Sequence, residues 1–398
     1  MDIYLYGASA QRAIRTARIT REFALVPSDR RWVTPCHPGQ IPAATLKLLR
    51  GFADHDVVHL RTPRRSRHRK YKDFQLHVTS EQLPAHSFYE LVPTGGQHGS
   101  LTAAVNANES LDERVRIFVD APTLQVAWLS YQMQRLVLKG RVTENYALLR
   151  TVGYVMELCG CYALVPSGQG CERGSYRLSP LLGVADLSRL LNEARNLKGL
   201  KLARKAVALA GDNSASPMES LLFLLFSLPA NRGGLGYSGV LINTPIDPKL
   251  LKEVGAAHDQ LTPDLQMWEL HVVFEFESRF AHDVYWDAPL DSLPDELLMA
   301  EDAAMNQAAR DQFREDRLRA QDYQALGLSM IPVTAEDLVN ANMFAAFAKR
   351  VASAIDRWQA GAKRVTELDR VRRLTAKADW QRHAMEVIHA FRPWTHGM

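Results

Sequence analysis

The sequence predicts a mixed α/β protein, and three observations carry this prediction. Val, Ile, Phe and Tyr are enriched, as in strands, over residues 55–61, 73–79, 87–92 and 115–120. Apolar residues at helical spacing predict helices over 123–138 and 143–158. The length of 398 residues suggests two or three domains of roughly 150 residues each. With 46% hydrophobic residues, the chain can bury a sizeable core.

The remaining elements before residue 215 follow in chain order. Residues 9–23 predict a short helix with Ser9 as its N-cap, and the Pro-rich stretch 26–42 predicts a loop. The glycines after Ala163 predict a turn between two short strands. Two helices are expected over 184–195 and 198–210, and the first break in organisation falls at 211–215.

The N-terminus and the cysteines bear on location. The first 20 residues have no apolar h-region, so we expect no secretory signal. The longest strongly apolar run, 221–228, is about half the ~20 residues that a membrane span needs. Four cysteines in so long a chain favour a reducing, cytoplasmic location. Three of them, at 159, 161 and 171, fit zinc spacings poorly, so structural thiols are favoured.

Charge is segregated along the chain, although the net charge is only +4. Residues 1–80 hold 15 Lys and Arg against 6 Asp and Glu, whereas residues 245–340 hold 7 against 20. The densest basic run, Arg61 to Lys72, is either a solvated loop or a phosphate-contacting surface. Its candidate nucleic-acid contacts are Arg61, Arg64, Arg65, Arg67, Arg69 and Lys70.

A buried helix is predicted to start at Ser216. Ser216 fits an N-cap, Pro217 fits the first helical position, and Glu219 stands where a capping box places its acid. Glu219 therefore has a structural explanation beside any role in chemistry.

Residues 262–278 predict two tightly connected strands. Alternation along the second strand puts Glu275 and Glu277 on one face and the aromatic residues on the other. A hairpin would bring Asp264 against Glu275, and such a carboxylate pair can hold Mg²⁺. The alternative is an exposed strand face that merely carries Glu.

A long helix is expected over 305–326, closed by Gly327, and a strand over 328–333. Arg314 lies on the basic flank of this helix, and Arg319 or its neighbours are candidates for phosphate contact. The alternative is a solvated amphipathic face. Residues 336–398 predict two or more helices.

In this order, the segments SPMES, TPDLQMW, VVFEFES and DRLRAQDYQALGLSMIPVT resemble the Vsr-like endonuclease domain of the PD-(D/E)XK nuclease superfamily. The likeness covers 214–338, about a third of the chain. The region upstream loosely resembles antitoxins of the AbiEi type. The resemblance implies a restriction-endonuclease-like mixed sheet flanked by helices, after a mixed α/β N-terminal region and before C-terminal helices.

The resemblance also implies roles. Asp264 and Glu275 match the metal-binding acids, Glu219 matches an acid on the preceding helix, and Glu277 stands where the family often has Lys. His282 is the candidate general base, because a histidine titrates near neutrality. The implied cofactor is Mg²⁺ or Mn²⁺, and the implied substrate is DNA.

We therefore expect four regions: a basic region over 1–120, a mostly helical region over 121–213, a nuclease-like domain over 214–338 and a helical extension over 339–398. The expected function is a metal-dependent DNA endonuclease in bacterial defence or DNA repair. The alternatives are an inactive DNA-binding regulator, such as the antitoxin of a toxin–antitoxin pair, or a protein-partner module that uses the acidic segment 283–303. No membrane partner is expected.

Overall fold

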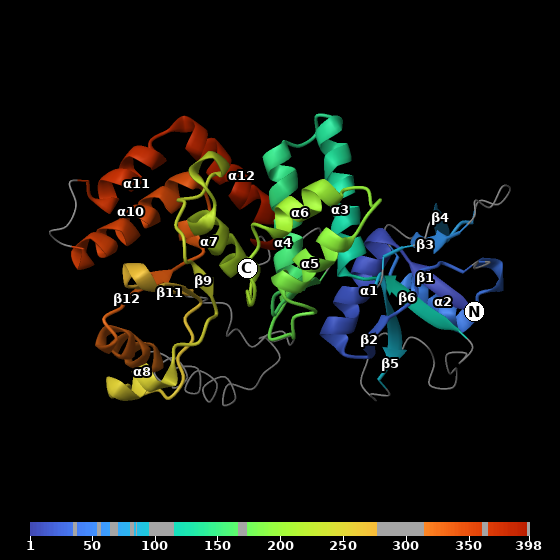
Figure 1. Cartoon of the computed structure of the whole chain (residues 1–398), viewed down its shortest axis with the longest axis horizontal. Helices are drawn as coiled ribbons and strands as arrows, with labels where there is room; N and C mark the ends of the chain where they lie inside the picture. The colour runs from blue at the N-terminus through green and yellow to red at the C-terminus, as the bar shows by residue number, and fades with distance from the viewer. Residues whose placement is uncertain are drawn as a thin grey trace, which may run out of the picture. The chain divides into compact units, whose positions relative to one another are not determined.

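A computed structural model of the chain describes residues 1–34, 38–53, 57–63, 71–79, 83–84, 86–94, 115–165, 173–276, 314–359 and 365–395 (Figure 1). It confirms a mixed α/β protein. The chain forms two compact units, residues 1–217 with 390–397, and residues 218–389. The predicted division into four regions remains a prediction. Among the described helices, none has both the length and the apolar character required to cross a membrane.

The first unit contains a six-stranded mixed sheet in the order β2-β5-β6-β1-β3-β4. Its strands are β1 (Asp2–Leu5), β2 (Phe23–Ser28), β3 (Val58–Thr62), β4 (Phe74–Val78), β5 (Phe88–Pro93) and β6 (Arg116–Asp120). Strand β1 runs parallel to β6 and antiparallel to β3. The four strands predicted from composition are all present.

Strand β2 corrects the loop that we predicted from the Pro-rich stretch. Residues 23–28 pair antiparallel with β5 although Pro27 lies among them. Because β2 is at the edge of the sheet, a proline there need not break a ladder on both sides. Strand β1 was not predicted either, since four residues are too short for a periodic signal.

The first unit also contains several helices. They are α1 (Gly7–Thr20), α2 (Ala43–Arg50), α3 (Pro122–Leu138), α4 (Glu144–Leu158), α5 (Val184–Glu193) and α6 (Leu200–Val207). Strands β7 (Ala163–Val165) and β8 (Arg173–Ser175) form the predicted short hairpin. Ser9 is not the N-cap of α1, because it lies inside the helix and its hydroxyl accepts a hydrogen bond from the backbone N–H of His59.

A buried ion pair joins α1 to α4. The Arg15 guanidinium donates two hydrogen bonds of 2.7 Å to the Glu157 carboxylate. Arg18 donates to the backbone carbonyls of Glu157 and Gly160. These contacts satisfy charges that would otherwise be costly to bury.

The second unit is built on a four-stranded sheet in the order β12-β11-β10-β9. Its strands are β9 (Leu241–Ile242), β10 (Leu265–Met267), β11 (Val272–Phe276) and β12 (Ser329–Val333). Strand β11 is antiparallel to β10 and parallel to β12. The helices are α7 (Pro217–Ser227), α8 (Pro248–Glu253), 314–325, α10 (Ala341–Trp358), α11 (Glu367–Thr375) and most of α12 (Ala378–Thr395).

Both faces of β11 are packed against other elements. On one face, Phe274 packs against Phe226 of α7 and Phe347 of α10. On the other face, Val273 lies in an apolar cluster with Tyr323 of the helix 314–325 and Leu251 of α8. The side chains of β11 therefore alternate between two packed layers, and Glu275 shares the face of Val273.

Candidate active site

Strands β10 and β11 bring Asp264 and Glu275 together. Leu265 pairs with Phe274, so the residue before β10 lies opposite Glu275. The backbone N–H of Phe276 donates a hydrogen bond of 2.6 Å to Asp264 Oδ2. The predicted contact across the two strands is present, and it fixes the carboxylate of Asp264 at the end of the sheet.

Glu219 reaches the same place from α7, which begins at Pro217 as predicted. Its carboxylate accepts a hydrogen bond of 2.6 Å from the side-chain amide of Asn243. Asn243 follows β9, and its backbone N–H donates to the carbonyl of Asp264. Asn243 thus links the acid on the helix to the acid on the strand.

The pKa of Asp264 is affected by the two other acids of the site, Glu219 and Glu275. Burial, followed by the charges of Glu219 and Glu275, raises the pKa of Asp264 to about 8. The Phe276 N–H and the Arg319 guanidinium act in the opposite direction. A carboxyl group with this pKa holds its proton at neutral pH unless a cation compensates the neighbouring charges.

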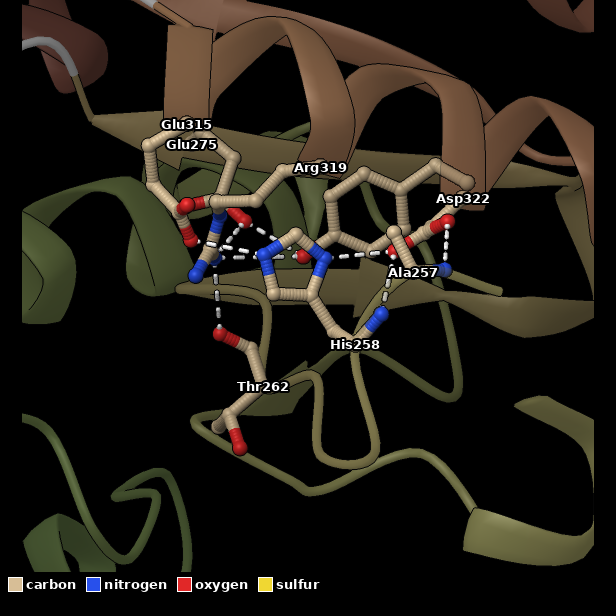
Figure 2. A network of polar contacts seen from close by, with 8 residues as sticks. Ala257, His258, Thr262, Glu275, Glu315, Arg319 and Asp322 are labelled. Atoms are coloured by element: carbon tan, nitrogen blue, oxygen red, sulfur yellow. Dashed lines mark hydrogen bonds and ion pairs between the residues drawn. The ribbon is translucent and has the colours of Figure 1, made fainter. Parts of the chain in front are cut away.

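Glu275 has two partners on the helix 314–325 (Figure 2). Arg319 Nη2 donates to Glu275 Oε1 at 2.5 Å, and the Tyr323 hydroxyl donates to the same oxygen. The same nitrogen of Arg319 also donates to the carbonyl of Thr262, at 3.3 Å. The Arg319 and Glu275 side chains remain 27% and 20% exposed, so solvent reaches the pair.

A second polar network lies on the same face of this helix. His258 Nδ1 is 2.5 Å from Asp322 Oδ2, and His258 Nε2 is 2.7 Å from Glu315 Oε1. Figure 2 shows the imidazole of His258 between these two carboxylates. The backbone N–H groups of Ala257 and His258 also donate to Asp322.

His258 is suited to tie the loop before Asp264 to the helix. The hydrogen bond to Asp322 and the charge of Glu315 raise the pKa of His258, although partial burial opposes them. The two carboxylates contact opposite nitrogens of the ring, so they do not converge on one point.

Several predicted site residues lie outside the described residues. They are Glu277, His282, Arg64, Arg65, Arg67, Arg69 and Lys70. Their roles remain predictions. Arg314 is exposed at the first described position of its helix, and Arg319 faces Glu275.

Among the basic residues of the run, Arg61 lies within strand β3, and its side chain is buried there and not on the surface. The residue is 8% exposed, and its guanidinium donates to both carboxylate oxygens of Asp120, at 2.6 and 3.0 Å. It also lies over the ring of Tyr6. Arg61 is therefore a buried partner for a buried acid in the first unit.

The donor set of the acidic site suits a hard divalent cation. The side chains are carboxylates, and burial together with the charges of Glu219 and Glu275 raises the pKa of Asp264. Among the described residues, no group of three His, Cys, Asp or Glu side chains has the arrangement of a complete metal site. Mg²⁺ commonly binds through one or two carboxylates and keeps several waters, so Asp264 and Glu275 are ligands of the kind that it prefers.

The sequence alone did not indicate Asn243, Tyr323 or the His258 network. Glu315, Arg319 and Asp322 stand at positions i, i+4 and i+7, so their common face was readable from spacing. His258 and Asn243 lie in loops, and their contacts depend on pairing that is distant in sequence. No local signal points to them.

Comparisons of this chain with protein-family models, with curated proteins and with solved structures find no match. The geometry of the second unit is therefore the basis for inferring a function.

Proposed function

We propose that the second unit hydrolyses phosphodiester bonds of DNA with a divalent cation, Mg²⁺ or Mn²⁺. The observation that carries the proposal is the convergence of Glu219, Asp264 and Glu275 from α7, the start of β10 and the end of β11. Glu219 is buried, and half-buried Asp264 has a pKa of about 8; three acids from separate elements in this state are unusual unless a cation neutralises them.

In this proposal, Asp264 and Glu275 hold the cation. A bound divalent cation would polarise a phosphoryl oxygen and lower the pKa of a water molecule. The Phe276 N–H orients Asp264, and Asn243 orients Glu219. Arg319 is partly exposed beside Glu275, where its planar guanidinium suits contact with phosphate oxygens.

The test is cleavage of supercoiled plasmid in Mg²⁺ or Mn²⁺. We expect the double variant Asp264→Asn, Glu275→Gln to cut at least about a hundredfold more slowly, which is the loss typical of removing one group that stabilises a transition state. Glu269→Gln is the matched control, because Glu269 is an exposed acid between the same two strands. Equal cutting by the wild type and the double variant would reject the site.

The pairing of Glu275 with Arg319 and Tyr323 favours a second candidate, a nuclease-like DNA-binding regulator without catalytic activity. A carboxylate that is already neutralised by a guanidinium has less need of a metal ion. Such a protein would bind DNA, and in a toxin–antitoxin or defence pair it would also bind a cognate protein. Binding and cleavage assays distinguish the two candidates, because the regulator would bind DNA but would not cut it in the presence of any divalent cation.

A further inference from the structure

Arg319 is paired with the carboxylate of Glu275, which a bound cation would need as a ligand. Its Nη2 lies 2.5 Å from Glu275 Oε1, and the Tyr323 hydroxyl donates to the same oxygen. A cation ligated by Glu275 would have to share this oxygen with two donors or displace one of them. Arg319 is the donor that can move, because Tyr323 is fully buried whereas the Arg319 side chain is 27% exposed.

The anchoring of Arg319 also differs from that of Asp264, the other acid proposed to hold the cation. Asp264 accepts a hydrogen bond of 2.6 Å from the backbone N–H of Phe276, a donor that is fixed within strand β11. Arg319 makes three contacts through one nitrogen, and the contacts to the Thr262 carbonyl and the Tyr323 hydroxyl are long, at 3.3 and 3.4 Å. Its attraction to Glu275 is therefore the main contact that holds it in this position.

We propose that Arg319 is a gate that a phosphodiester opens. The guanidinium pairs with Glu275 while the site is empty, and it turns to the phosphate when a phosphodiester arrives, which frees Glu275 to ligate a cation. A phosphodiester offers a guanidinium two non-bridging oxygens in a bidentate arrangement, whereas Glu275 offers Arg319 a single oxygen here. Cation and phosphodiester then bind with positive cooperativity, each strengthening the binding of the other by the same factor.

This inference rests on the proposed function, and its test separates the two. Mn²⁺ binding is measured by calorimetry on the full chain, with and without the dinucleotide dTpdT, which carries one phosphodiester. Chloride at equal ionic strength replaces dTpdT in the reference titration. The variants are Arg319→Gln and the matched control Arg317→Gln, an exposed arginine on the same helix.

We expect Arg319→Gln to bind Mn²⁺ about fivefold more tightly than the wild type without dTpdT, as loss of a partly exposed ion pair implies. We expect dTpdT to tighten Mn²⁺ binding to the wild type and to Arg317→Gln but not to Arg319→Gln. Equal effects of dTpdT on all three proteins would overturn the gate while leaving the cation site intact. The double variant Asp264→Asn, Glu275→Gln is titrated as well. If the wild type binds Mn²⁺ no more strongly than this double variant, with or without dTpdT, the proposed function is rejected.

Discussion

Asp264 has a strongly raised pKa in the folded protein, so its protonation depends on folding. It lies between two other acids, and its hydrogen bond to the Phe276 N–H favours the ionised form without overcoming burial. In the unfolded chain an aspartate has a pKa of about 3.9. The folded state therefore keeps a proton, between about pH 4 and pH 8, that the unfolded state releases.

This difference predicts that stability falls as pH rises from 4 to 8, because the folded state binds more protons over that range. Asp264→Asn keeps an acceptor for the Phe276 N–H and removes the charge. We expect the variant to be more stable than the wild type at pH 8.5, by at least about 1 kcal/mol, the equivalent of roughly one pKa unit. Urea unfolding at pH 5 and pH 8.5 measures this.

Glu269→Gln serves as the control for the loss of one acid on the same hairpin. If Asp264→Asn and Glu269→Gln unfold with the same dependence on pH, then Asp264 does not carry the buried proton.

His258 gives a prediction with the same dependence on pH, but here the substitution lowers stability instead of raising it. Its pKa is raised in the folded state, so its contribution to stability is complete below about pH 6.5 and is lost as pH rises through the folded value. His258→Gln should therefore lower the melting temperature at pH 6 more than at pH 9. The shift is small, because ion pairs open to solvent contribute at most about 1 kcal/mol.

Glu315→Gln should reproduce part of the loss at pH 6, since it removes one of the two carboxylates that face the ring. An equal loss at pH 6 and pH 9 for His258→Gln would mean that the imidazole acts by packing alone.

Helices α1 and α4 depend on the ion pair between Arg15 and Glu157. Arg15→Met leaves a buried carboxylate without its guanidinium, and we expect a loss of about 3 kcal/mol in the free energy of unfolding. Adding Glu157→Gln should recover part of that loss, because the amide oxygen can still accept from the Leu164 N–H. Urea unfolding of the single and double variants measures both effects.

Arg189→Met is the surface control, because Arg189 is an exposed partner of Asp186 and Glu193. Should Arg15→Met cost no more than Arg189→Met, the pair is not a structural link between the helices.

Elements with strong periodicity were predictable, and elements defined by long-range pairing were not. Helices α3 and α4 and the hairpin of β10 and β11 were readable from apolar spacing and alternation. Strand β1 is short, and β2 carries a proline, so each exists because of its partners in the sheet.

The same division holds for the candidate site. Asp264 and Glu275 could be paired from the sequence, since a hairpin fixes their register. The partners of Glu275 and of Asp322 could not, because they depend on how the helix 314–325 and the loop before Thr262 pack on the sheet. The basic run likewise could not reveal that Arg61 is buried beside Asp120.

Across the whole chain, opposite charges gather in different parts. Residues 1–80 are basic, and residues 245–340, which hold Asp264 and Glu275, are acidic. We therefore expect the basic part to supply most of any DNA affinity. Neutralising Arg64, Arg65, Arg67 and Arg69 to Gln should lower the slope of log affinity against log salt by up to about 3.6, at about 0.9 for each phosphate contact.

Arg61 is left unchanged in that variant, because it pairs with Asp120 and its loss would disturb folding. Fluorescence anisotropy of a labelled duplex across salt concentrations gives the slope. A slope equal to that of the wild type would exclude the basic run as the contact surface.

The central claim is that Asp264 and Glu275, with Glu219 beside them, hold a divalent cation in the second unit. A crystal structure determined in Mn²⁺, with anomalous scattering recorded, tests it most directly. We expect an anomalous peak bonded to the carboxylates of Asp264 and Glu275, and none there in crystals of the Asp264→Asn, Glu275→Gln variant. Crystals that show no peak at Asp264, with Glu275 still paired to Arg319 at saturating Mn²⁺, would contradict the claim.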